Sequence, residues 1–532
     1  MFYSKQWKKQ IFSVFLVCAV VLSCLGGCGR STPSSQAESD GSSQAESESE
    51  SSSSKIDTSK AVTLKMYLVG DKGTDFDMVY DKINEEMKKE INATLDVKFL
   101  SWSDSSTKYS LLFSSGEDFD LIFTASGWEH YEETVAKKGF YELTDQFLNT
   151  YAPDIMEIEP ETAWDQAKVD GKIYMVPNYA KEYNAEIMAV RGDLMGKYGF
   201  SDITSQSQLE SFFDKVAADE KTTGISPLGT QGKALQYSYL LEANGWTVVK
   251  GTVEPLFAYQ YDDSSNTKVI SVTESEEFKQ YAEKMKEMQQ KGYWSTDALS
   301  TQDTRSDNFI AGTSAAMEWN LGSCVSYAKE VNKDHPSWDA KVIDILPDKE
   351  KLINPYTNNG MAINARSQNP ERAMMAINQL MTNKTIYDLA AYGIEGVHYE
   401  AVGDKEYTPL DQASQYPAGG SCNWGWNNDN LKRTLHADSS DTIAAKSTEL
   451  TTLWDSNYAT HPLDTFSFNE ETVKTQDTIL TTLITQYMDP ISTGLVDDPD
   501  QAVTEFISQL KAAGIDAVTQ EIQSQIDTFV KQ

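Results

Sequence analysis

Apolar strands alternate with amphipathic helices through the first part of the chain. Residues 61–69, AVTLKMYLV, and 94–102, TLDVKFLSW, are rich in β-branched and aromatic residues, which predicts two strands. A short helix is expected over 108–116 and a third, almost wholly apolar strand over 119–125. Between the first two strands, apolar side chains recur at helical spacing at Phe76, Val79, Ile83, Met87 and Ile91. This order predicts an α/β fold with a parallel sheet covered by helices on both faces.

The segment after the third strand is the first place to look for a ligand site. In open α/β sheets, ligands gather at the carboxyl ends of the strands. The sequence there is SGWEHYEE, so Trp128 and Glu129 are candidate binding residues. The alternative is that Trp128 only covers the end of the lobe, and the sequence leaves both interpretations open.

A second candidate segment is NWGWNN, residues 423–428. In a strand, residues two apart point the same way, so Trp424 and Trp426 could line one surface. Gly425 would let a partner approach the backbone, and the flanking amides can donate and accept hydrogen bonds. We expect at least one of the two indoles to contact a ligand; packing between domains is the alternative.

The first residues resemble an export signal. Lys5, Lys8 and Lys9 precede a long apolar run that ends in LGGC at Cys28. This ending is similar to a lipobox, so residues 1–27 are expected to be a signal peptide and Cys28 the lipidated residue. An uncleaved membrane anchor is the alternative, and Cys24 is a weaker lipidation candidate. Either reading places the chain outside the cytoplasm.

Residues 28–60 are dominated by serine and glutamate and contain little that could be buried, which predicts a disordered tether. The remaining part, of about 470 residues, is long enough for two lobes. The chain carries 45 basic and 80 acidic residues, for a net charge of -35. Such a charge disfavours nucleic acid and anionic membrane surfaces as partners.

No recognisable catalytic or metal-binding motif stands out. The five histidines lack metal-ligand spacing, and there is no G-x-S-x-G turn or P-loop. The acidic run at 262–266 lacks the glycine and terminal glutamate of an EF-hand loop. We therefore expect no catalytic residues, metal or cofactor. In the folded part, Cys324 and Cys422 could form a disulfide or remain as two buried thiols.

Several later segments carry a family resemblance through their order. GKIYMVP (171–177), GDLMGKYGF (192–200), FIAGTSAAMEWN (309–320) and GMAIN (360–364) together resemble extracellular solute-binding proteins of ABC importers. AYGIEGVHYE, residues 391–400, and the terminal helix are similar to a subgroup, the LplA-type lipoproteins, which carry an added C-terminal domain.

The resemblance implies a two-lobe type II periplasmic-binding-protein fold with hinge strands and a mainly helical C-terminal extension. It places the N-terminal lobe at 61–183 plus 358–400 and the C-terminal lobe at 184–357 plus 401–532. It implies an oligosaccharide ligand, permease subunits as partners, and a lipid-anchored, monomeric protein on the extracellular face of a membrane that is expected to be Gram-positive. A peptide receptor of the same fold and an extracellular carbohydrate-active enzyme remain as alternatives.

Sugar rings stack on aromatic faces, and their hydroxyls pair with carboxylates and amides. On this basis the candidate ligand-binding residues come from both lobes. They are Trp128, Glu129, Tyr179, Tyr183, Trp246, Glu318, Trp319, Asn320, Asn423, Trp424, Trp426 and Asn427.

Overall fold

The computed structural model describes residues 56–229, 235–300, 304–417, 421–436 and 440–531. The expected signal peptide, the lipidation site Cys28 and nearly all of the expected tether lie outside these residues. Residues Asp57–Gln532 form one unit. No helix among the described residues is long and apolar enough to cross a bilayer.

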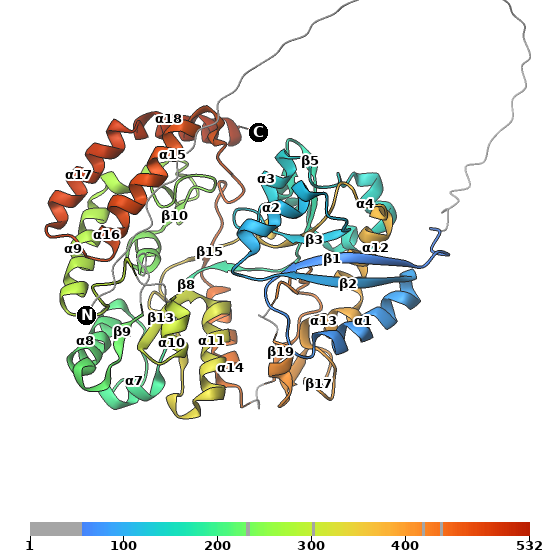
Figure 1. Ribbon diagram of the computed structural model, residues 1–532, viewed down its shortest axis with the longest axis horizontal. Helices are drawn as coiled ribbons and strands as arrows, with labels where there is room; N and C mark the ends of the chain where they lie inside the picture. The colour runs from blue at the N-terminus through green and yellow to red at the C-terminus, as the bar shows by residue number, and fades with distance from the viewer. Residues whose placement is uncertain (1–55, 230–234, 301–303, 418–420, 437–439, 532) are drawn as a thin grey trace, which may run out of the picture. The chain divides into compact units, whose positions relative to one another are not determined.

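A five-stranded sheet forms the centre of the N-terminal lobe (Figure 1). Its order is β2-β1-β3-β16-β6. β1 runs parallel to both β2 and β3, whereas β16 runs antiparallel to β3 and β6, so the sheet is mixed rather than wholly parallel. The strands are β1 (Val62–Val69), β2 (Ala93–Leu100), β3 (Leu121–Thr124), β16 (Gly360–Ile363) and β6 (Met175–Pro177).

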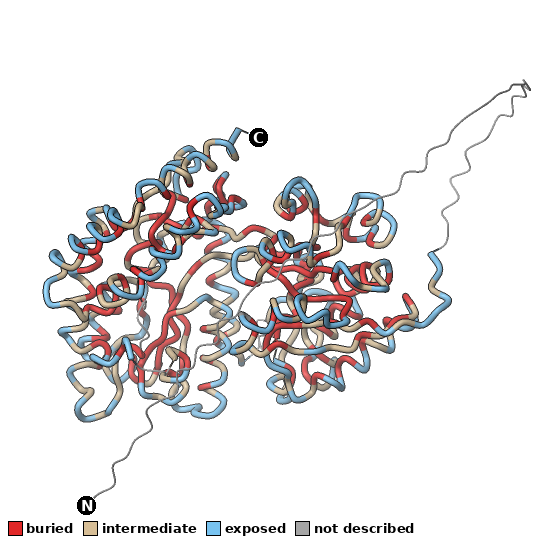
Figure 2. The backbone as a smooth tube through the Cα atoms, turned by 45° about the horizontal axis from the view of Figure 1, so that its top comes forward, coloured by how far each residue is buried: buried red, intermediate tan, exposed pale blue. Residues whose placement is uncertain are grey.

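Helices cover this sheet as the apolar spacing predicts. The five residues expected to face inward from the first helix, from Phe76 to Ile91, are all buried. Buried residues recur along the chain in the interior of both lobes (Figure 2). α1 also packs against two helices from the second half of the chain, α12 and α13. The helices of this lobe are α1 (Phe76–Ile91), α2 (Ser105–Ser115), α3 (Tyr131–Ala136), α4 (Asp145–Tyr151), α5 (Pro153–Ile158), α6 (Glu161–Gln166), α12 (Pro370–Thr382) and α13 (Lys384–Tyr392).

Two small sheets complete the lobe. One is the hairpin of β4 (Lys168–Val169) and β5 (Lys172–Ile173). The other has the order β17-β18-β19 and is formed by β17 (Tyr399–Val402), β18 (Glu406–Pro409) and β19 (Thr434–Leu435).

The C-terminal lobe contains a four-stranded sheet of order β14-β8-β13-β9 and a three-stranded sheet of order β10-β11-β12. The strands of the two sheets are β8 (Glu186–Val190), β9 (Ser226–Leu228), β13 (Ser314–Asn320), β14 (Lys341–Ile343), β10 (Trp246–Val248), β11 (Phe257–Gln260) and β12 (Ile270–Ser271). The helices here are α7 (Gly192–Tyr198), α8 (Gln206–Thr223), α9 (Glu276–Gln290), α10 (Arg305–Ile310), α11 (Leu321–Asp334) and α14 (Thr442–Trp454).

The expected helical C-terminal extension is confirmed. It packs on α9, and its buried residues join the largest core of this lobe (Figure 1). The extension consists of α15 (Lys474–Leu483), α16 (Asp489–Ser492), α17 (Pro499–Ala512) and α18 (Ile515–Phe529).

A separate small sheet joins segments from three distant parts of the chain. Its order is β20-β15-β7, with β7 (Tyr183–Asn184), β15 (Lys351–Ile353) and β20 (Tyr458–Ala459). β7 follows the chain's passage out of the first sheet, and β15 precedes its return through β16. These paired segments are the hinge strands that a two-lobe fold requires.

The structure corrects one lobe assignment. We expected residues 401–532 to belong to the C-terminal lobe, but Tyr416, Cys422 and Trp426 pack in the core of the N-terminal lobe. The reason is a pairing that composition cannot reveal: the backbone N–H of Cys422 donates to the carbonyl of Val69, at the end of β1. From α14 onward the described residues pack with the second lobe.

The two remaining cysteines are buried free thiols, as one of the two alternatives predicted. Cys324 belongs to the core around α11 and β13, and Cys422 belongs to the core of the N-terminal lobe. The two side chains therefore lie in different packing clusters.

Candidate functional site

Three segments meet at the carboxyl ends of the parallel strands of the N-terminal lobe. Trp102 lies two residues after the end of β2, and Trp128 lies in the loop that follows β3. The segment 421–428 reaches the same edge, because Cys422 N–H donates to Val69 O at 2.7 Å. This is the edge at which ligands gather in open α/β sheets.

Three indoles lie there, two of them beside Phe123. The rings of Trp102 and Trp424 are stacked, with centroids 6.3 Å apart and planes inclined by 16°. The Phe123 ring lies 5.5 Å from Trp128 and 6.4 Å from Trp424. Trp102 and Trp128 are each 42% exposed and Trp424 is half-buried, so indole surface is left for a ligand. We call Trp102, Trp128 and Trp424 the aromatic wall.

The second crossing between the lobes, the segment between β15 and β16, fixes two indoles of the wall. Trp128 Nε1 donates to the carbonyl of Asn358 at 2.8 Å, and Trp424 Nε1 donates to Asn359 Oδ1 at 3.3 Å. Both indole N–H groups are thus satisfied by protein. The two rings can therefore offer only their apolar faces to a ligand. Asn358 and Asn359 set the orientation of those faces.

The carboxylate of Glu182 ties the same asparagines to the first crossing, the segment between β6 and β8. Glu182 accepts hydrogen bonds from the side-chain amides of Asn178 at 3.2 Å, Asn358 at 2.7 Å and Asn359 at 2.8 and 2.7 Å. We call this group the Glu182 clamp. Because charge-assisted hydrogen bonds are the stronger class, the clamp holds the two crossings in one arrangement beside the wall.

The loop that carries Trp128 lies against the C-terminal lobe. A methyl group added at Gly127, whose φ is +83°, would lie 3.8 Å from Lys250 Cδ. Lys250 is anchored there because its Nζ donates to the carbonyl of Asp464 at 2.9 Å. Burial lowers the pKa of Lys250, whereas the nearby carboxylates of Asp464 and Glu132 oppose that effect. The wall therefore stands on the side of the first lobe that meets the second.

Trp319 is the aromatic candidate at the corresponding end of the second lobe. It is half-buried near the end of β13, where Asn320 pairs with Glu186 at the start of β8. The Arg305 guanidinium lies over its ring at 4.4 Å, and the ring of Tyr327 stacks at 6.0 Å. Because β7 leads directly into β8, this is the sheet end next to the crossings.

Two polar groups beside Trp319 have distinct roles. Asn320 is exposed, and its Oδ1 caps α11 by accepting from Ser323 N–H at 2.9 Å. Burial, together with the charge of Glu318, raises the pKa of Glu186 to about 8. Burial therefore favours the protonated Glu186 carboxyl, the form that can donate a hydrogen bond.

The two indoles of NWGWNN do not share a face. Trp426 is 1% exposed and belongs to the core, whereas Trp424 joins the wall. The segment is a turn rather than a strand, so the two-residue alternation does not apply. Gly425 serves internal packing, because a methyl group there would lie 2.8 Å from Phe123. Asn423 is buried too, and its Oδ1 accepts from the hydroxyl of Tyr80 at 2.6 Å.

Two candidates in the second lobe also prove to be internal. Trp246 is 6% exposed, and its Nε1 donates to Gln260 Oε1 at 3.0 Å across a strand pair. Glu318 is buried and accepts from the backbone N–H of Leu235 at 2.6 Å and from the hydroxyl of Ser238. Both residues hold the lobe together and have their polar groups committed to protein.

The candidates on the crossings contact protein as well. The Tyr179 ring stacks on Tyr356 at 6.4 Å, and its backbone N–H donates to the carbonyl of Asn427 at 2.8 Å. The hydroxyl of Tyr183 donates to Asp455. These residues join the crossings to one another and to the wall segment, while Tyr179, Tyr183 and Asn427 each keep part of their surface exposed.

Glu129, next to Trp128, is buried at 3% exposure. Its Oε1 has no hydrogen-bond partner among the described residues. Burial raises its pKa to about 7, and the neighbouring His130 opposes that rise. Its backbone pairs with Ala125, so the residue shapes the loop beneath the wall.

Sequence reasoning missed Trp102 and the two asparagines of the second crossing. The strand expected over 94–102 includes Trp102, but β2 ends at Leu100 and Trp102 is exposed. Residues just after the carboxyl end of a strand are ligand-site candidates, which is why Trp128 is expected to bind. The same rule applies to Trp102 once the strand is seen to end at Leu100. Asn358 and Asn359 carry no local signal, because their role depends on contacts with Trp128, Trp424 and Glu182.

No group of three or more histidine, cysteine, aspartate or glutamate side chains within the described ranges is placed to hold a metal ion. The wall offers partly exposed indole faces, which suit stacking against a ligand.

Comparison with known proteins agrees with this architecture. The structure superimposes on the N-glycan transport solute-binding protein NgtS from Streptococcus pneumoniae with a TM-score of 0.70 and 24% identity, covering 89% of this chain and all of that one. An extracellular solute-binding protein from Bifidobacterium longum subsp. infantis gives a TM-score of 0.62 at 15% identity, covering 88% and 99%. These similarities confirm the two-lobe type II fold.

In sequence, the chain is 26% identical over 547 residues to a carbohydrate ABC transporter substrate-binding protein of Streptococcus pneumoniae, covering 99% of both chains. A domain of unknown function matches residues 462–531, the helical extension. The family described as bacterial extracellular solute-binding protein matches residues 81–397, more than half of the chain. The chain therefore belongs to the bacterial extracellular solute-binding proteins.

Proposed function

We propose that this protein captures an oligosaccharide between its two lobes and delivers it to the permease of an ABC importer. The observation that carries the proposal is the aromatic wall, three indoles at the carboxyl ends of β1–β3 with their faces partly exposed. Sugar rings present C–H patches that stack on such faces, and their hydroxyls pair with amides and carboxyls. The 26% identical relative named as a carbohydrate transporter component supports the same ligand class.

Capture would proceed by closure of the lobes about the hinge strands. The wall supplies stacking surface on the first lobe, and Trp319 with Arg305 supplies a partner surface on the second. A ligand that contacts both surfaces at once stabilises the closed arrangement, because those contacts exist only there. The Glu182 clamp would then set where the wall stands relative to the crossings. The role is binding, and we propose that no catalysis accompanies it.

The proposal includes a location. Residues 1–27 would be removed as a signal peptide, Cys28 would be acylated, and residues 28–60 would tether the body to the outer face of a Gram-positive membrane as a monomer. Metabolic labelling with palmitate tests the anchor: label in the intact chain and none in Cys28→Ala supports it, and equal label in both contradicts it.

Isothermal titration with a panel of oligosaccharides and short peptides tests the ligand class. Mannose- and N-acetylglucosamine-containing glycans belong in the panel because NgtS has been crystallised with Man1GlcNAc and Man5GlcNAc. Saturable binding of a glycan series supports the proposal. Binding of peptides without any glycan would assign the cleft to another solute, and release of a shorter glycan would indicate an enzyme.

A further inference from the structure

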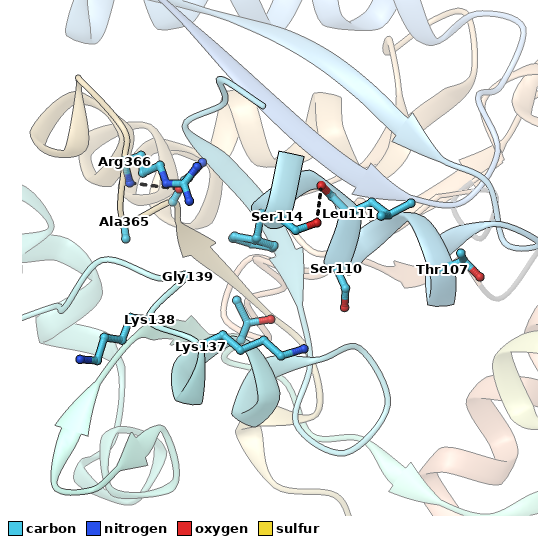
Figure 3. Close-up of a pocket in the computed structure, with 12 residues that line it drawn as sticks. Thr107, Ser110, Leu111, Ser114, Lys137, Lys138, Gly139, Ala365 and Arg366 are labelled. Carbon is cyan, nitrogen blue, oxygen red and sulfur yellow. Dashed lines mark hydrogen bonds between the residues drawn. The ribbon is translucent and has the colours of Figure 1, made fainter. Parts of the chain in front are cut away.

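A groove separate from the aromatic wall lies on the N-terminal lobe. It is bounded by α2, by the end of α3 with the residues that follow it, and by residues 364–366 after β16 (Figure 3). Its volume is about 560 Å³, within the range of sites that hold small molecules. One side of the floor is fixed because Ala365 N–H donates to the carbonyl of Gly139 at 2.8 Å.

Cationic side chains from two separate elements line this groove. Lys137 and Lys138 follow α3, and Arg366 follows β16 (Figure 3). The chain has 80 acidic and 45 basic residues, so carboxylate partners are abundant. Lys137 pairs with Glu133. Across the part of the chain that the structure describes, neither Arg366 nor Lys138 has an ion pair or a side-chain hydrogen bond.

The rest of the lining is rich in hydroxyl groups beside an apolar edge. Thr107, Ser110 and Ser114 belong to α2, and the Ser114 hydroxyl donates to the carbonyl of Leu111 at 3.2 Å, which leaves its oxygen free to accept. Leu111 is 54% exposed and supplies the apolar edge of the groove. The surface thus combines cations, hydroxyls and a small apolar patch.

We propose that this groove is a second ligand site and that it takes a small sugar acid. A guanidinium binds a carboxylate through two parallel hydrogen bonds, which suits Arg366. The hydroxyls of α2 match the hydroxyls of a pyranose ring, and Leu111 matches its C–H face. The site lies outside the cleft contacts described above, so it goes beyond the proposed transport function.

Equilibrium dialysis of the full chain in detergent with radiolabelled D-glucuronate tests the proposal. We expect saturable binding of one equivalent, displaced by unlabelled glucuronate but at least tenfold less well by glucose. Arg366→Gln should weaken glucuronate binding tenfold or more. Trp424→Ala, which alters the cleft, and Lys333→Gln, which removes an exposed positive charge on α11, should leave it unchanged.

The arms of the experiment separate the alternatives. Inorganic phosphate that displaces glucuronate at equal concentration would show a simple anion site and overturn the sugar assignment. Displacement by pentaglutamate but not by free glucuronate would reassign the groove to an acidic protein partner. Absence of saturable binding, or loss of binding in Trp424→Ala with retention in Arg366→Gln, would overturn the proposal while leaving the transport function intact.

Discussion

Trp102 and Trp424 stand 322 positions apart in the chain, yet their rings stack with centroids 6.3 Å apart and planes inclined by only 16°. Trp102 follows β2, and Trp424 lies in a turn whose preceding residue Cys422 pairs with Val69 at the end of β1. Because each is partly exposed, both indoles leave apolar surface at the edge where an α/β sheet presents its ligand.

Removal of either indole should weaken glycan binding without unfolding the lobe. Covering about 50 to 80 Å² of indole surface contributes roughly 1 to 2 kcal/mol, or about a 5- to 30-fold change in affinity. We expect Trp102→Ala and Trp424→Ala each to show a loss of this size by titration calorimetry. Leu453→Ala, which truncates a side chain 44% exposed on α14, is the matched control and should bind as the parent does. Unchanged affinity in both tryptophan variants would remove the wall from the site.

Trp426 should behave in the opposite way, although it lies two residues from Trp424. Truncating a buried tryptophan leaves a cavity and costs about 3 to 5 kcal/mol of unfolding free energy. We expect Trp426→Ala to show that loss in urea denaturation. Phenylalanine at position 426 should recover part of the stability, and a Trp426→Ala variant as stable as the parent would contradict the assignment to the core.

The difference between these neighbours shows where sequence reasoning ends. The periodicity of β1, α1 and β2 predicts those elements within about two residues, because apolar spacing is set by the local backbone. It cannot tell which indole of NWGWNN is buried, since that depends on the pairing of Cys422 with Val69 and on Phe123 beneath Gly425. Asn423 and Glu318 were chosen for chemistry that suits sugars, but their polar atoms are used by Tyr80 and by Leu235. The sequence shows which polar and aromatic side chains are present. Contacts between distant segments decide which of these side chains are left to contact a ligand.

The Glu182 clamp should influence affinity through the crossings. Glutamine at position 182 keeps the shape of the side chain but replaces one acceptor oxygen with an NH2 donor. That donor would face the amide donors of the asparagines, so a hydrogen bond would be lost. A hydrogen bond to a charged group contributes roughly 1.5 to 3 kcal/mol. We expect Glu182→Gln to lower the unfolding free energy by about that amount and also to weaken glycan binding. The matched control is Glu449→Gln, an exposed glutamate on α14, and equal stability of the two variants would show that the clamp has no structural role.

Buried carboxyls should make stability fall as pH rises. Glu159 is 6% exposed, and neither of its oxygens has a hydrogen-bond partner among the described residues. Burial raises its pKa from 4.5 to about 8. Between these pH values the folded protein holds a proton on Glu159 that the unfolded chain has released. The unfolding free energy is therefore highest below about pH 4.5 and falls as the pH rises to about 8.

The measurement is the melting temperature of the parent and of Glu159→Gln from pH 5.5 to 8.5. Glutamine cannot ionise, so the variant should gain stability relative to the parent as pH rises. Parallel curves for the two proteins would show that Glu159 is ionised, or solvated, in the folded state. Glu449→Gln again provides the control, because that side chain is 67% exposed.

The central claim is that the aromatic wall binds a glycan in the cleft between the lobes. Calorimetric titration of residues 57–532 with mannose- and N-acetylglucosamine-containing oligosaccharides, in the parent and in the Trp102→Ala/Trp424→Ala double variant, tests it most directly. The account predicts saturable binding of one glycan per chain and loss of that binding in a double variant that still melts cooperatively. Undiminished glycan binding by the folded double variant, or binding of peptides alone by the parent, would contradict it.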